Sequence, residues 1–164
     1  MASPKAFVVS VDMGYGHERA AYALRDLAAK GGIITANHYP GIPDADHDLW
    51  EQGRKYYETV SRLQPLPVVG AALFEVLVDA FQEIDPFYPR RDLSRQTLQL
   101  RQVYHSVTHR KQGKHLIDTL RTQIKNGRKA LPFVSTFFLP AFAAEEFDYP
   151  GEIYLIVCDA DIAR

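Results

Sequence analysis

The sequence is poor in cysteine, with one in 164 residues. Cys158 therefore has no partner for a disulfide within the chain, which excludes the disulfide-rich class of small secreted domains. Because Cys158 follows the apolar run 153–157, we expect a buried thiol in a reducing, cytoplasmic setting. Residues 1–5 lack the basic region and long apolar segment of a secretory signal peptide, which agrees with that expectation.

The sequence also lacks an excess of charge of either sign. Its 19 Lys and Arg residues nearly balance its 20 Asp and Glu residues, for a net charge of −1. Such a chain has no bulk attraction for nucleic acid, and we expect no nucleic-acid partner. A hydrophobic content of 46% excludes disordered and low-complexity classes. The length suffices for one hydrophobic core, so we expect a single domain over 1–164.

No apolar run is long and uncharged enough to predict a membrane-spanning helix. The most apolar helical segment, 68–84, is shorter than the roughly 20 residues that a span needs, and it carries Glu75, Asp79 and Glu83. We expect a core or lid helix there. The alternative is a lid that faces a lipid acceptor, which would give the protein peripheral contact with a membrane.

Strand and helix patterns alternate along the chain. Period-2 or continuous apolar runs predict strands at 6–11, 33–39, 131–138 and 152–158. Helical spacing predicts helices at 18–30, 47–64, 68–84, around 93–107, at 116–124 and at 140–147. A β-α-β unit followed by further strands predicts an α/β fold: a Rossmann-like parallel sheet with flanking helices and a long helical insertion.

The segment Asp12-Met-Gly-Tyr-Gly-His-Glu-Arg19 joins the first strand to the first helix. Gly14 and Gly16 are predicted to lie in the turn, where glycine tolerates positive φ and permits close approach of a ligand. The N–H groups at the start of the helix favour an anion, and His17 is expected to point into the same crevice.

Three kinds of nucleotide loop are disfavoured at this turn. A dinucleotide fingerprint would need glycine at Arg19 and an acidic residue where the second strand ends in Asn37 and His38. A P-loop would need Gly-Lys-Ser/Thr, which is absent. The Asp-x-Gly-x-Gly loop of actin-like ATPases turns a hairpin, whereas here a helix is predicted to follow. We therefore expect no cofactor.

Residues 12–21 resemble the glycine-rich, histidine-ended loop and Ala-rich helix that open the N-terminal domain of GT-B type glycosyltransferases. The similarity is to monogalactosyldiacylglycerol synthases and the peptidoglycan GlcNAc transferase. Residues 132–138 and 153–159 are similar to two later strands of that family, which end in Ser/Thr and in Asp.

This resemblance implies an acceptor-binding domain of a nucleotide-sugar-dependent transferase. His17 would be the general base or would orient the acceptor hydroxyl. The substrate-binding residues that it implies are Gly14, Tyr15, Gly16, Glu18, Arg19, Ser135, Thr136 and Asp159. The UDP-sugar donor would bind mainly to a second, C-terminal domain beyond Arg164, the acceptor would be a sugar or a lipid, and the isolated chain would be inactive.

Two alternatives stay open. Asp159-Ala-Asp161 has the Asp-x-Asp spacing with which GT-A type transferases bind manganese, so a metal-dependent GT-A enzyme is one alternative. A non-catalytic Rossmann-like module that binds a ligand or a protein is the other. His105 and His109 stand one helical turn apart without the glutamate of a zinc helix, and we expect a surface pair.

Overall fold

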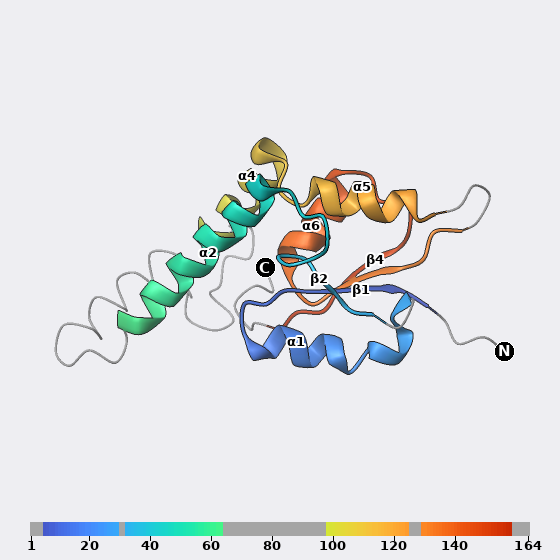
Figure 1. Ribbon diagram of the computed structural model, residues 1–164, viewed down its shortest axis with the longest axis horizontal. Helices are drawn as coiled ribbons and strands as arrows, with labels where there is room; N and C mark the ends of the chain where they lie inside the picture. The colour runs from blue at the N-terminus through green and yellow to red at the C-terminus, as the bar shows by residue number, and fades with distance from the viewer. Residues whose placement is uncertain (1–4, 30–31, 64–97, 125–128, 159–164) are drawn as a thin grey trace, which may run out of the picture.

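A computed structural model describes residues 5–29, 32–63, 98–124 and 129–158. Its four strands are β1 (Phe7–Ser10), β2 (Ile34–Thr35), β3 (Phe133–Ser135) and β4 (Ile153–Leu155). They form one all-parallel sheet in the order β2-β1-β3-β4 (Figure 1). The predicted Rossmann-like α/β fold with a parallel sheet is confirmed.

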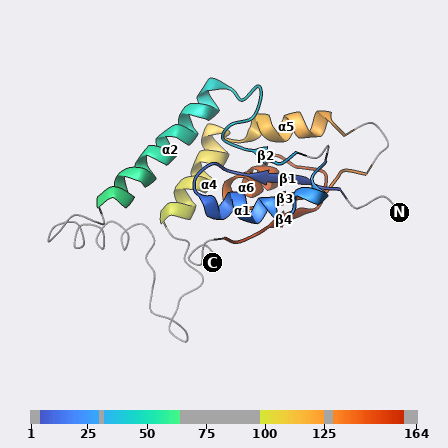
Figure 2. The same cartoon turned by 60° about the horizontal axis from the view of Figure 1, so that its bottom comes forward.

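Helices cover both faces of this sheet. Helix α1 (Tyr15–Tyr22) lies on one face, while α5 (Lys114–Thr122) and α6 (Phe138–Glu146) lie on the other (Figure 1). Helices α2 (Asp44–Leu63) and α4 (Leu98–Arg110) lie at the end of the sheet where β1 leads into α1, as a second view also shows (Figure 2). The carboxyl ends of the strands therefore face α2.

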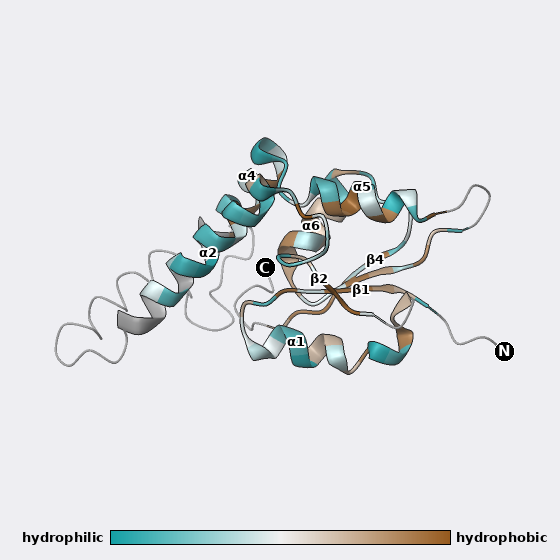
Figure 3. Ribbon diagram, viewed as in Figure 1, coloured by the Kyte–Doolittle hydropathy of each residue, from teal (hydrophilic) through white to brown (hydrophobic). Residues whose placement is uncertain are grey.

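Strand β1 is buried from end to end, because it pairs with β2 on one side and β3 on the other. Successive side chains point to opposite faces of a strand, and the sequence supplies apolar residues for both. One face contributes Phe7, Val9 and Val11 to the main core, and the other contributes Ala6 and Val8 to a smaller core under α1. The hydropathy of the ribbon shows the contrast between apolar β1 and mainly polar α2 (Figure 3).

The first helix differs from its prediction over 18–30. It begins at Tyr15, so Gly16 belongs to the helix, and of the two glycines only Gly14 has positive φ, at 127°. It ends at Tyr22 and is followed by a 3₁₀ turn, Arg25–Leu27. The backbone of Ala29 then donates to Ala6 O at 2.8 Å. This pairing with the start of β1 overrides the helical pattern of the sequence.

The prediction of a buried thiol at Cys158 is wrong, because this residue is exposed. The predicted strand 152–158 is reduced to three residues, and β4 pairs with β3 alone in the described part of the chain. An edge strand buries less than a central one, and Ile153, Tyr154 and Leu155 are all partly open to solvent.

Other predicted boundaries shift by a few residues. The strand predicted at 33–39 is reduced to β2, because the chain turns at Ala36 and Asn37. Helix α6 begins at Phe138 rather than Pro140. The segment 68–84 lies outside the described residues. Within the ranges that the structure describes, no helix is long and apolar enough to cross a membrane.

Gly113 lets α5 pack tightly against α6. It precedes α5 with φ 83°, a left-handed conformation that side chains other than glycine rarely adopt. A Cβ built on Gly113 would lie 2.8 Å from Cβ of Ala143 on α6. The backbone conformation and the close helix contact both require glycine here.

We expect Gly113→Ala to lower the free energy of unfolding by about 2 kcal/mol or more, through left-handed strain and overpacking. Gly53→Ala is the matched control, since Gly53 lies inside α2 and a Cβ added there would meet no atom of the described residues within 4 Å beyond its own helix backbone and chain neighbours. Alanine there should raise stability by roughly 0.5–1 kcal/mol. Urea unfolding of both variants measures the difference, and equal effects at the two positions would contradict this account.

Candidate functional site

The site lies where the strand order reverses. From β1 the chain crosses to β2 on one side, and β3 later pairs with β1 on the other. Open parallel sheets bind ligands at the carboxyl ends of the strands beside such a switch point. Asp12 to Gly14 follow β1 there, and Thr136 and Phe137 follow β3. These two loops form the centre of the candidate site.

His17, in the first turn of α1, is held by the loop after β3. Its side chain is buried, with 8% of the residue exposed, and Nδ1 lies 2.8 Å from the carbonyl oxygen of Thr136. A carbonyl oxygen only accepts hydrogen bonds, so Nδ1 carries the proton in this contact. In the neutral ring the lone pair available to accept a proton is then on Nε2. This Nδ1-protonated tautomer is the one that a general base acting through Nε2 needs.

Phe137 packs between His17 and α2. Its ring meets the imidazole edge to face, with the centroids 5.0 Å apart, and lies 6.1 Å from the ring of Trp50 on α2. Edge-to-face aromatic contacts have a preferred orientation, so Phe137 restricts how the imidazole can turn. Phe137 was not predicted as a site residue, and its only signal in the sequence is its place directly after the Ser-Thr pair.

The predicted substrate-binding residues Ser135 and Thr136 are both buried. Ser135 Oγ donates to the carbonyl oxygen of Phe137 at 2.6 Å, and Thr136 Oγ1 donates to Ser10 Oγ at 3.2 Å. The two hydroxyls therefore shape the loop after β3. A direct role for them in binding substrate stays a prediction.

The remaining predicted residues that the structure describes lie in α1 or directly before it. Gly14, Tyr15, Gly16, Glu18 and Arg19 are all exposed, and Tyr15 is the most open at 79%. Asp159 and Asp161 lie outside the described residues. The structure therefore brings His17 together with Ser135 and Thr136, while the exposed residues line the surface beside them.

A hollow of only about 10 Å³ adjoins His17 on the side of β3 and β4. Its walls are Thr136, Phe137, Phe138 and the segment 155–158. It is too small for a substrate group, since a volume of roughly 10–15 Å³ holds about one water molecule.

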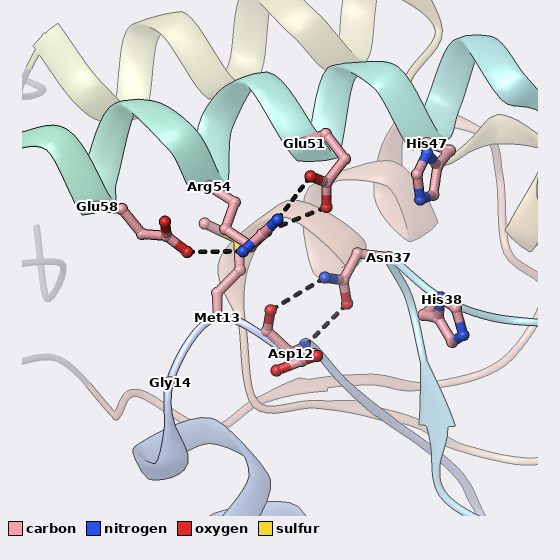
Figure 4. Close-up of a pocket in the computed structure, with 9 residues that line it drawn as sticks. All are labelled: Asp12, Met13, Gly14, Asn37, His38, His47, Glu51, Arg54 and Glu58. Carbon is pink, nitrogen blue, oxygen red and sulfur yellow. Dashed lines mark hydrogen bonds and ion pairs between the residues drawn. The ribbon is translucent and has the colours of Figure 1, made fainter.

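A much larger cavity, about 520 Å³, opens on the other side of the Asp12–Gly14 turn, between this turn, the end of β2 and α2 (Figure 4). That volume is within the usual range for small-molecule sites, roughly 300–1,000 Å³. The lining residues are Asp12, Met13, Gly14, Asn37, His38, His47, Glu51, Arg54 and Glu58. The four from α2 went unrecognised in the sequence, because a polar helix face usually faces solvent.

Arg54 forms ion pairs with two carboxylates in this cavity (Figure 4). Its Nε and Nη2 donate to the two oxygens of Glu51 at 3.1 and 2.7 Å, and Nη1 donates to Glu58 at 2.6 Å. The hydrogen bonds from Arg54 lower the pKa of Glu51, and the carboxylates raise the pKa of Arg54. Glu51 and Arg54 are therefore both charged at neutral pH.

Asn37 fixes the turn after β1. Its Oδ1 accepts from the backbone N–H of Asp12 at 2.8 Å, and its Nδ2 donates to the backbone carbonyl of Asp12 at 3.1 Å. This side chain substitutes for a backbone pairing that the short β2 does not provide. Asn37 thus sets the conformation from which both hollows are built.

The chain has no match among protein-family models, curated proteins or solved structures. Within the described ranges, no three His, Cys, Asp or Glu side chains lie close enough together to hold a metal ion. His105 and His109 stack on the exposed side of α4, as the surface pair that was predicted.

Asp46 joins the N-terminal turn of α2, beside the cavity, to the start of α5. Its Oδ2 accepts from the backbone N–H of Gly113 at 3.3 Å, at the start of α5. Nearby, the hydroxyl of Tyr39 is 2.8 Å from Nδ1 of His115. Burial raises the pKa of Asp46, so the ionised carboxylate weakens the fold relative to the protonated form.

We expect Asn37→Ala to lower the free energy of unfolding by about 1–3 kcal/mol, because it leaves both backbone groups of Asp12 without this partner. Asn37→Asp should be milder, since it keeps an acceptor for the N–H and loses only the donor to the carbonyl. Urea unfolding and amide hydrogen exchange at Asp12 measure the two effects. Unchanged exchange in the alanine variant would show that Asn37 does not hold the turn.

We expect the stability supplied by Asp46 to fall as pH rises. With a native pKa above the unfolded value of about 3.9, the native state binds more protons in that window. The unfolding free energy of wild type relative to Asp46→Asn should therefore decrease from acid pH towards neutral pH. A difference that increases with pH would contradict this. Asp46→Ala, which removes the acceptor for Gly113, should cost about 1–3 kcal/mol.

Proposed function

We propose that the chain is the acceptor-binding domain of a glycosyltransferase that uses a UDP-sugar donor. The observation that carries the proposal is the hydrogen bond from Nδ1 of His17 to the Thr136 carbonyl, 2.8 Å long. It selects the tautomer with the lone pair on Nε2, at the switch point of the sheet. The resemblance of residues 12–21 to GT-B loops gives this histidine the same role.

In the proposed reaction, Nε2 of His17 accepts the proton of an acceptor hydroxyl while that oxygen attacks the anomeric carbon of the donor. The new glycosidic bond forms as the bond from the anomeric carbon to the diphosphate breaks, and UDP leaves with the electron pair. The imidazolium that results still donates from Nδ1 to Thr136, and a charged donor makes that hydrogen bond stronger. The donor would be held mainly by a domain outside these 164 residues.

A second candidate is a non-catalytic module that binds a ligand or a protein. The burial of His17 and the hollow of only about 10 Å³ beside it favour this candidate, because no substrate group fits against the ring in this conformation. The large cavity beside the Asp12–Gly14 turn would serve either function. The metal-dependent GT-A alternative depends on Asp159 and Asp161, which lie outside the described residues.

His17→Asn separates the two candidates. The asparagine amide can donate to Thr136 in place of Nδ1, so the fold should be kept, but it has no basic nitrogen. We expect kcat of the full-length polypeptide to fall roughly 100-fold or more, with little change in KM. The assay is UDP release from UDP-glucose, UDP-galactose and UDP-GlcNAc, with glycoside and diacylglycerol acceptors.

His105→Asn is the matched control, since His105 is exposed on α4 and lines neither of the two hollows. It should leave UDP release unchanged. Transfer that survives His17→Asn would remove His17 from the reaction, and no acceptor-dependent UDP release from wild type would favour the binding module.

A further inference from the structure

The large cavity is built for hydrogen bonding rather than for an apolar ligand. Most of the described lining side chains carry charged or polar groups, and Met13 is the apolar side chain among them (Figure 4). These groups come from three separate segments: the turn after β1, the end of β2 and α2. A bare lipid chain would displace water from these groups without offering hydrogen bonds in exchange, which is costly.

The charges of the cavity also argue against a phosphate ligand. Among the described residues that line it, Asp12, Glu51 and Glu58 supply three carboxylates against the guanidinium of Arg54. That guanidinium already binds Glu51 through two nitrogens and Glu58 through a third. An arriving phosphate would have to displace a carboxylate and would be repelled by the others.

A simple cation is disfavoured for the opposite reason. The guanidinium of Arg54 lies between the carboxylates and balances part of their charge, and His38 and His47 add imidazoles to the same wall. The lining therefore offers donors and acceptors side by side. Neighbouring hydroxyl groups of a sugar both donate and accept, and they match such a lining.

We propose that this cavity binds a neutral polyhydroxylated group, the sugar or polyol part of a ligand, through the carboxylates of Glu51 and Glu58. The identification of that group as part of the acceptor rests on the proposed transferase function. Each carboxylate oxygen has more than one lone-pair site, so it can accept from a hydroxyl while it accepts from Arg54. The ion pairs hold both carboxylates in place before the ligand arrives.

The packing relates this cavity to His17. The Asp12–Gly14 turn is shared, since it lines the cavity and leads directly into α1. Phe137 contacts His17 on one side and Trp50, the residue before Glu51, on the other. A ligand that shifts α2 would therefore also shift the ring that packs against the imidazole.

The test is a titration of the isotope-labelled 164-residue chain, followed by NMR. The probes are methyl β-D-glucopyranoside and myo-inositol as neutral polyols, inorganic diphosphate as an anion and ethanolamine as a cation. We expect both polyols to shift the amide signals of residues 12–14 and 51–58 saturably, and the charged probes to leave them unchanged. Saturable shifts there from diphosphate or ethanolamine would overturn the proposal. So would the absence of a saturable shift from every probe.

Glu51→Gln and Glu58→Gln should each raise the dissociation constant of the polyol about tenfold, because a charged acceptor is replaced by a neutral one. Glu145→Gln, at an exposed position on α6, removes the same charge outside the cavity and should bind like wild type. Equal affinity in all three variants would also overturn the proposal. His17→Asn should retain polyol binding, so a failure of the transferase mechanism is distinguishable from a failure of this site.

Discussion

The pairing of β1 on both sides is the constraint on which the rest of the structure depends. A central parallel strand has its backbone groups satisfied by two neighbours and its side chains buried on both faces. Its two neighbours come from different parts of the chain: β2 is the next strand in sequence, whereas β3 comes more than a hundred residues later. The turn after β1 therefore meets side chains from β2, β3 and α2 at once.

This arrangement makes two different surfaces from one turn. Towards β3, the carbonyl of Thr136 and the ring of Phe137 set the tautomer and orientation of His17. Towards β2 and α2, the same turn borders a charged cavity in which Arg54 bridges Glu51 and Glu58. The turn thus separates a buried imidazole from an open cavity lined mainly by charged and polar side chains.

Much of the fold could be predicted from local pattern. The apolar run at 6–11, the glycine turn and the helical spacing after it gave a correct strand-turn-helix order, and a parallel sheet followed from the β-α-β unit. The boundaries were less accurate, because Ala29 pairs back with Ala6 and shortens the first helix. Cys158 was placed in the core because its apolar run was assigned to a buried strand, whereas β4 is an edge strand.

The sequence by itself determined the residue types at the site: a glycine that accepts φ 127°, a histidine in the first turn of a helix and a Ser-Thr pair after a strand. Only the tertiary structure decided what they do. His17 and Thr136 are 119 residues apart, and Asp12 and Asn37 are 25 apart. Periodicity reports which face of an element is buried, but it carries no information on which distant groups meet there, and hydrogen bonds between those groups set the chemistry.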